Sequence, residues 1–274
     1  MPEGELDRKI ARLREILCEM GSAAIGFSGG VDSTFLLKVA SEALGDGVVA
    51  ITAFGAIHPA FELESARRTA ADLGVRLLEI RNDINLDPEF AENPPDRCYL
   101  CKKALFTSVI DAARKQGVDH VADGSNLDDL KDYRPGARAL SELGVQSPLI
   151  EAGFTKADVR QLSRTLGLSA WDRPAMACLA SRFPYGTRIT PERLAMVDRA
   201  EKALRDEGFS QVRVRYHGHT ARIEVPPQEI PRFSDESLRN RVFEAIKQAG
   251  FTYVALDLKG YRTGSMNESL KNTS

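Results

Sequence analysis

A glycine-rich hexapeptide joins an apolar run to a helical pattern near the N-terminus. It runs from Ser28 to Ser33 and contains Gly29, Gly30, Val31 and Asp32. Glycines carry no Cβ and take φ > 0 readily, so consecutive backbone N–H groups can turn around an anion. Asp32 or Ser33 can cap the following helix, whose N-terminus is the positive end of its dipole. The segment predicts a phosphate-binding loop, and the alternative is an ordinary Gly-Gly turn before a capped helix.

Three of the four cysteines form a second group of residues that could carry out chemistry. Cys98 and Cys101 open a helical pattern, and Cys178 stands in a segment of small residues. A helix N-terminus favours thiolates, so the pair can present both sulfurs to one metal. Three thiolates are one ligand short of a closed structural zinc site, and they are what an iron–sulfur cluster with one open iron needs. The alternative is that these cysteines are structural.

Arginines alternate along two predicted strands at 211–216 and 221–225. A two-residue turn between the strands would place Arg215 opposite Arg222 and Arg213 opposite Glu224, all on one face. Like charges in opposite positions repel each other unless an anion lies between them. The pattern therefore predicts either a phosphate or carboxylate site or a solvated outer face, the usual arrangement on one side of an antiparallel sheet.

The elements that must position these residues alternate between strand and helix. Strands are predicted at 23–27, 48–53, 76–80 and 120–122, and helices at 59–73, 99–116 and 155–166. This order predicts an α/β fold with a parallel sheet covered on both faces, whose ligands bind beyond the carboxyl ends of the strands. The hexapeptide, the stretch after Ala53 and the segment Asp123 to Asp129, which contains Gly124, all lie at that edge. We expect one domain at 1–186 and a smaller α+β domain at 187–274.

Composition narrows the class of partner. The net charge of −2 argues against a protein that holds nucleic acid by bulk electrostatics, so a small-molecule substrate is expected. The sequence has no apolar stretch of the roughly 20 residues that cross a bilayer and no secretory signal, so we expect no membrane contact and a cytoplasmic location. Whether the chain forms a homo-oligomer stays open.

Five segments together resemble one family. The hexapeptide resembles the pyrophosphate loop (PP-loop) of ATP pyrophosphatases, which have an adenine nucleotide alpha hydrolase-like fold and cleave ATP between the α and β phosphates. With four further segments it resembles the LarE family, ATP-dependent sacrificial sulfur transferases of nickel-pincer nucleotide biosynthesis. The segments are SGGVDS at 28–33, WDRP at 171–174, CLASRFPYG at 178–186, VRVRYH at 212–217 and DLKGYRTGSMNE at 257–268.

The resemblance implies sulfur insertion into pyridinium-3,5-biscarboxylic acid mononucleotide, a nicotinate-derived substrate. ATP with Mg²⁺ would adenylate a ring carboxylate, and a sulfur nucleophile would then displace AMP. In one version of the family, the cysteine that matches Cys178 gives up its own sulfur and becomes dehydroalanine. In the other, which we favour because all three cysteines are present, Cys98, Cys101 and Cys178 hold a [4Fe–4S] cluster whose open iron carries the sulfide.

The resemblance also assigns roles to single residues. Cys178 would deliver the sulfur, Arg182 would lie near the reacting carboxylate, and Asp32 would lie near Mg²⁺. Arg213 and Arg215 would hold the substrate phosphate, and Glu224 and Asp257 are weaker candidates for a second metal or substrate contact. The ATP site would comprise Ser28, Gly29, Gly30, Asp32, Ser33 and Gly124.

Two other functions fit the loop. A PP-loop tRNA thiolase also combines adenylation with cysteines, but it needs an RNA-binding surface that the acidic balance does not favour. A non-catalytic module could use the same loop to sense adenine nucleotides. Pyrophosphate release that depends on a nicotinate-derived dicarboxylate would exclude such a module.

Overall fold

The chain forms two compact units in a computed structural model that describes residues 4–131, 135–173, 177–262 and 266. The first unit comprises residues 1–55, 60–84 and 96–176, and the second comprises 56–59, 85–95 and 177–274. Pro174 and positions 263–265, 267 and 268 of the family segments lie outside the described residues. The predicted domain limits, 1–186 and 187–274, stay a prediction.

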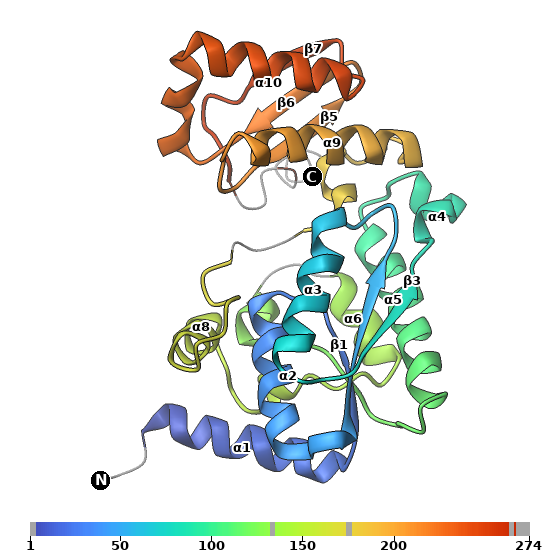
Figure 1. Cartoon of the computed structure of the whole chain (residues 1–274). Coiled ribbons are helices and arrows are strands. Elements are labelled where there is room, and N and C mark those ends of the chain that lie inside the picture. Colours follow the sequence, from blue (N-terminus) through green and yellow to red (C-terminus); the bar gives the residue numbers. More distant parts are fainter. Residues whose placement is uncertain (1–3, 132–134, 174–176, 263–265, 267–274) are drawn as a thin grey trace. The chain divides into compact units, whose positions relative to one another are not determined.

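The first unit, with β1 and β3 labelled in Figure 1, contains a four-stranded sheet in the order β3-β2-β1-β4. All three pairings are parallel, and Ala24 of β1 lies opposite both Val49 and Val121. The side chains of β1 and the first five of β2 are nearly all buried, as both faces of a covered parallel sheet require. The predicted parallel sheet is confirmed. The strands are β1 (Ala23–Gly26), β2 (Val48–Phe54), β3 (Leu77–Arg81) and β4 (Val121–Ala122).

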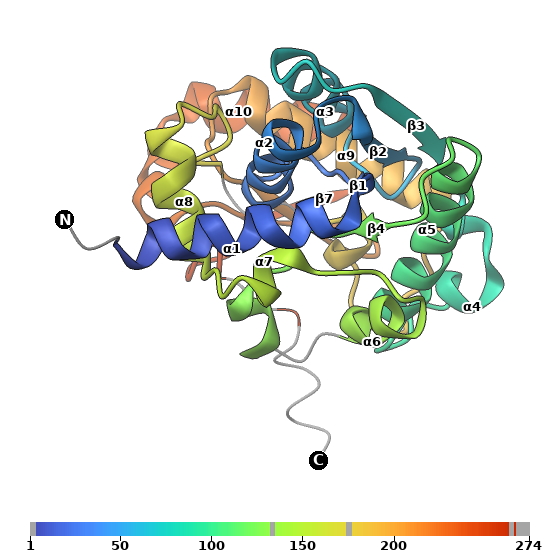
Figure 2. The same cartoon turned by 90° about the horizontal axis from the view of Figure 1, so that it is seen from below.

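Helices cover both faces of this sheet (Figure 2). Alternate residues of β1 enter different cores, since Ala23 and Ile25 pack with the residues of α1, α2 and α8, whereas Ala24 packs with those of α5 and α6. This alternation follows from the period of two in a strand. The helices of the unit are α1 (Glu5–Met20), α2 (Val31–Leu44), α3 (Ala60–Asp72), α5 (Arg97–Arg114), α6 (Pro135–Glu142), α7 (Pro148–Glu151) and α8 (Lys156–Thr165).

The second unit is the predicted α+β arrangement. Strands β5 (Arg213–His217) and β6 (Thr220–Glu224) are antiparallel, and β7 (Tyr253–Leu256) runs parallel to β6. The two-residue turn at Gly218 and His219 gives the predicted register, with Arg215 opposite Arg222 and Arg213 opposite Glu224. Its helices are α4 (Pro88–Ala91), α9 (Pro191–Asp206) and α10 (Glu236–Gln248), with 3₁₀ turns η4 (Leu179–Arg182) and η5 (Pro227–Ser234).

The described helices include none that is long and apolar enough to cross a membrane.

Substitution of Phe35 tests the core between the sheet and α2. Its ring is fully buried and meets Phe154 edge-on, with 5.3 Å between the ring centroids. We expect Phe35→Ala to lower the free energy of unfolding by about 3–5 kcal/mol because it leaves a cavity. Urea unfolding followed by the fluorescence of the single tryptophan, Trp171, reports on the first unit. Phe61→Ala is the control, since Phe61 is 44% exposed on α3; an equal loss in both variants would contradict this description of the core.

Candidate functional site

The phosphate-loop candidate lies between β1 and α2, where the structure corrects the predicted helix start. Helix α2 begins at Val31 with Gly30 as its N-cap, so neither Asp32 nor Ser33 caps it. Both lie inside the first turn instead. Gly30 has no side chain with which to satisfy the N–H groups of that turn, and Gly29 has φ +72°, a conformation that favours glycine. The first turn of α2 can therefore donate its N–H groups to an anion.

Ser28 and Ser33 close the loop through their hydroxyls. The two Oγ atoms lie 3.1 Å apart, and Ser33 Oγ also donates to the Gly30 carbonyl at 3.2 Å. The Gly30 N–H donates to Ser28 Oγ at 3.3 Å. The loop is thus held in shape by its own hydroxyl and backbone groups. Binding of an anion by these residues stays a prediction.

Gly124 comes from the third predicted loop and lies against the same helix start. A Cβ at this position would stand 2.9 Å from the Ser33 backbone nitrogen, so a larger residue would push the two segments apart. The neighbouring Asp123 is buried and accepts hydrogen bonds from Ser125 Oγ at 2.5 Å and Ser147 Oγ at 2.6 Å. The fold therefore brings the first and third loops together, as their common sheet edge predicts.

Three residues far away in the sequence hold the loop: Lys156 was not indicated by the sequence, whereas Arg173 belongs to the WDRP segment and Asn126 to the third predicted loop. Arg173 donates to the Gly29 carbonyl at 3.1 Å and to Ser65 Oγ at 2.5 Å, which fixes the glycine turn. The buried Asn126 donates through Nδ2 to Asp32 Oδ1 at 3.3 Å, and Lys156 Nζ pairs with Asp32 Oδ2. The positions paired with the loop are 94 to 144 residues away in the sequence, so no local pattern reveals them.

Cys98 and Cys101 lie in the first turn and a half of α5, in the first unit. Cys98 is exposed and Cys101 partly exposed. Cys178 belongs to the second unit, where it precedes η4 and is partly exposed. Over the part of the chain that the structure describes, no three His, Cys, Asp or Glu side chains gather closely enough to hold a metal ion. A cluster on these three cysteines stays a prediction.

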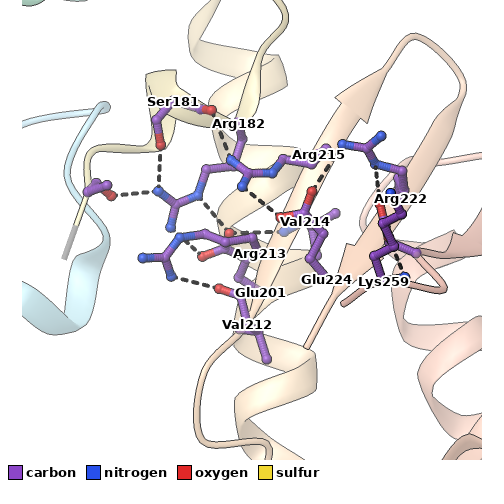
Figure 3. Close-up of polar contacts among 12 residues, drawn as sticks. Ser181, Arg182, Glu201, Val212, Arg213, Val214, Arg215, Arg222, Glu224 and Lys259 are labelled. Carbon is purple, nitrogen blue, oxygen red and sulfur yellow. Dashed lines mark hydrogen bonds and ion pairs between the residues drawn. The ribbon is translucent and has the colours of Figure 1, made fainter. Parts of the chain in front are cut away.

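In the second unit, Arg182 fixes the segment that carries Cys178 (Figure 3). Its guanidinium donates to the carbonyls of Ala177 at 2.6 Å and Cys178 at 3.0 Å. Its other nitrogens make a two-pronged ion pair with Glu201, at 2.7 and 2.9 Å. Both side chains are almost fully buried, at 2% and 1% exposed. Such a pair is geometrically specific and holds the Cys178 backbone against α9.

Glu201 is a further residue that the sequence did not indicate. Burial alone would raise its pKa, but the charge and hydrogen bonds of Arg182 and the Val214 N–H lower the pKa below its usual range. Its carboxylate also accepts from Arg205 at 3.4 Å. Because Val214 lies on β5, Glu201 joins the segment of Cys178 to the strand of the candidate phosphate-binding arginines.

The arginine face of β5 and β6 is buried, so the predicted solvated outer face is wrong. Arg213 and Arg215 are 9% and 4% exposed. The carboxylate of Glu224 offsets the repulsion expected between Arg215 and Arg222, because it pairs with both, at 2.6 and 3.0 Å (Figure 3). Asp257 lies 3.7 Å from Arg222. The structure thus gives Glu224 and Asp257 arginine partners, while their predicted metal or substrate contacts stay predictions.

Arg213 is buried in the field of a second cation, Arg182. Burial, and next the charge of Arg182, lower the pKa of its guanidinium. Arg215 meanwhile donates to the Ser181 carbonyl at 3.1 Å, beside the Cys178 segment. A buried cation close to another cation is stabilised by an added anion. The chemistry of this face therefore fits a phosphate or carboxylate ligand.

Substitution of Arg182 tests the buried pair. We expect Arg182→Met to lower the free energy of unfolding by about 3–5 kcal/mol at pH 8, because Glu201 loses its buried partner. In the wild type the lowered pKa of Glu201 gives stability above about pH 4.3 that is lost as the pH falls through the folded pKa. In the variant the buried charge of Glu201 has lost the Arg182 guanidinium, so we expect its pKa to rise. Protonation of Glu201 then removes the unfavourable charge, and the loss in free energy of unfolding becomes smaller towards pH 5.

Scanning calorimetry at both pH values measures this effect. Arg188→Met is the matched control, since Arg188 and its partner Glu92 are both about 60% exposed. That exposed pair contributes about 1 kcal/mol or less. A cost for Arg182→Met that is independent of pH, or no larger than the control, would contradict the assigned role of the pair.

Comparison with known proteins gives clear relatives, although no family model matches the chain. The chain is 44% identical to an uncharacterized protein of Synechocystis sp. over 265 residues, covering 97% of this chain and 99% of the relative. It is 41% identical over 266 residues to the pyridinium-3,5-bisthiocarboxylic acid mononucleotide synthase of Lactiplantibacillus plantarum, covering 97% and 96%. A subunit of the glutamine-hydrolyzing GMP synthase of Archaeoglobus fulgidus is 22% identical over 222 residues, which cover 74% and 70%. With its parallel-sheet PP-loop fold and near-complete alignment to the Lactiplantibacillus synthase, the chain belongs to the LarE family of enzymes.

Proposed function

We propose that this enzyme uses ATP to insert sulfur into pyridinium-3,5-biscarboxylic acid mononucleotide and forms its thiocarboxylic acid. The observation that carries the proposal is the 41% identity, over 97% of the chain, to a synthase named for the bisthiocarboxylic product. The loop between β1 and α2 and the buried arginine face add chemical support. They offer one site suited to a polyphosphate and another suited to a substrate phosphate.

Activation of the carboxylate is the step that requires ATP. A carboxylate cannot expel oxide, whereas an acyl-adenylate expels AMP. Ser28, Gly29, Gly30, Ser33 and the α2 N-terminus would hold the phosphates, with Gly124 close against that turn. Mg²⁺ prefers oxygen ligands, which Asp32 supplies, and it would neutralise charge on the leaving pyrophosphate.

Substrate binding would use the second unit. Arg213 and Arg215 are suited to the phosphate of the mononucleotide, because their buried guanidinium groups gain from an added anion. Arg182 donates to Glu201 and to the Cys178 carbonyl, so we propose that it serves the reacting carboxylate by positioning Cys178.

Sulfur transfer would use Cys178. In the sacrificial route the Cys178 thiolate attacks the acyl-adenylate and AMP leaves. A base then takes the Cα proton, the Cβ–S bond breaks with its electrons on sulfur, and thiocarboxylate and dehydroalanine remain. In the cluster route, Cys98, Cys101 and Cys178 would hold a [4Fe–4S] cluster that supplies sulfide. The described residues do not gather three such ligands, whereas the sacrificial route needs Cys178 alone.

Protein mass before and after turnover distinguishes the two routes. For the sacrificial route we expect a loss of about 34 Da, the mass of H₂S, that maps to Cys178. For the cluster route we expect iron and sulfide in anaerobically purified protein and an unchanged polypeptide mass. Repeated turnover by an iron-free protein of unchanged mass would contradict both.

Substitution of Cys178 separates activation from transfer. We expect Cys178→Ala to release pyrophosphate from ATP in the presence of the dicarboxylate substrate and to form no thiocarboxylate. Cys18→Ala is the control, because Cys18 lies exposed on α1 and should leave both products unchanged. Coupled detection of pyrophosphate and mass spectrometry of the nucleotide give the two readouts. Thiocarboxylate formed by Cys178→Ala at the wild-type rate would refute the role of this cysteine.

A further inference from the structure

The Cys178 segment, residues 178–186, contains the short turn η4 and no other helix or strand. Most of its backbone groups therefore need partners from other parts of the chain. The Leu179 N–H donates to the Ile57 carbonyl at 2.8 Å, and Arg215 donates to the Ser181 carbonyl at 3.1 Å. The position of the thiol thus depends on residues outside the segment.

Asn93 holds the far end of this segment. Its side-chain Nδ2 donates to the Pro184 carbonyl at 2.8 Å and to the Phe183 carbonyl at 3.4 Å. Its backbone carbonyl accepts from the Gly186 N–H at 3.0 Å. Asn93 is fully buried and belongs to the second unit, as does the segment that it contacts. One residue therefore binds the segment at three of its last four positions.

The backbone of Asn93 has a conformation that disfavours most side chains. Its φ is +58°, and among the residues that the structure describes it is the only one besides glycine with a positive φ. A Cβ is unfavourable in this left-handed region, although asparagine tolerates it better than most residues, and glycine has no such cost. Such an outlier is informative where the surroundings hold it in place. The side chain must contribute something that glycine cannot, and its contacts are those with the two carbonyls of the Cys178 segment.

The same segment contacts the strand of the candidate phosphate-binding arginines. The ring of Phe183 stacks on Tyr216 of β5, with 5.0 Å between the ring centroids, and Ser181 accepts from Arg215 (Figure 3). A shift of the segment would therefore move the thiol relative to a substrate bound at this strand. Misplacement of reacting groups by about 1 Å can slow a reaction about 100-fold.

We propose that Asn93 is a positioning residue for sulfur transfer, which holds the Cys178 segment so that sulfur delivered at Cys178 meets the activated carboxylate. The inference rests on the proposed function and adds to it a residue from the stretch after α4. It implies a specific defect. Without the Asn93 side chain, ATP still activates the carboxylate, but sulfur transfer is slow. Water then hydrolyses the acyl-adenylate to AMP and the starting carboxylate, so pyrophosphate is released without thiocarboxylate.

Asn93→Gly in the full chain tests the proposal. Glycine accepts the same φ and retains the backbone bond to Gly186, while the two side-chain bonds are lost. In a single turnover with ATP, Mg²⁺ and the dicarboxylate mononucleotide, a coupled assay measures pyrophosphate and mass spectrometry measures thiocarboxylate. We expect thiocarboxylate formation to slow about 10- to 100-fold, and pyrophosphate release to change by no more than about threefold. A general loss of folded protein would lower both alike.

Asn85→Ala is the matched control. Asn85 lies on the same stretch of the second unit and is 6% exposed, and its Oδ1 has no hydrogen-bond partner among the described residues. Its loss should leave equal amounts of the two products. If the wild type forms thiocarboxylate and Asn93→Gly forms it equally fast, or loses pyrophosphate release to the same extent, the inference is wrong while the proposed function stands. If the wild type forms none, the proposed function itself fails. Should the glycine variant not fold, Asn93→Ser, with a single donor, takes its place.

Discussion

The arrangement of the first unit around its glycine-rich loop depends on the backbone N–H groups in the first turn of α2. These groups have no intrahelical partner, and the glycine N-cap offers no side chain to satisfy them. The turn can stay open only if its surroundings hold it in place. The covered sheet fixes β1, Arg173 fixes the Gly29 carbonyl, and Gly124 lies where a Cβ would collide with Ser33. The N–H groups of this turn therefore stand at the carboxyl edge of the sheet, the edge at which ligands of such sheets bind.

The second unit contains several buried arginines. Burial of a guanidinium is unfavourable unless carboxylates and carbonyls accept its hydrogen bonds. Glu201 forms an ion pair with Arg182, and Glu224 forms ion pairs with Arg215 and Arg222. The network also joins three pieces of backbone, since Arg182 binds the Cys178 carbonyl and Glu201 accepts from Val214. The thiol segment and the arginine strand are therefore held in one arrangement, as a reaction between a bound substrate and a cysteine requires.

Local patterns predicted much of this organisation. The period of two and the two-residue turn fixed the pairing of Arg215 with Arg222, and alternating strands and helices predicted the parallel sheet. The start of α2 was misplaced because glycine serves as N-cap where a polar side chain is usual. Lys156 and Glu201 were not predicted for another reason, and neither were the contacts of Asn126 and Arg173. Each acts on residues far away in the sequence, and an isolated lysine or glutamate in a helix is typical of a solvated surface.

The stoichiometry of a single turnover tests most directly whether this enzyme activates a carboxylate and then inserts sulfur. Protein purified without oxygen is mixed with limiting ATP, Mg²⁺ and the dicarboxylate mononucleotide, and the products are quantified by mass spectrometry. Activation followed by sulfur insertion predicts pyrophosphate, AMP and thiocarboxylate in equal amounts. Formation of ADP and phosphate, or of pyrophosphate and AMP without a matching amount of thiocarboxylate, would contradict the account.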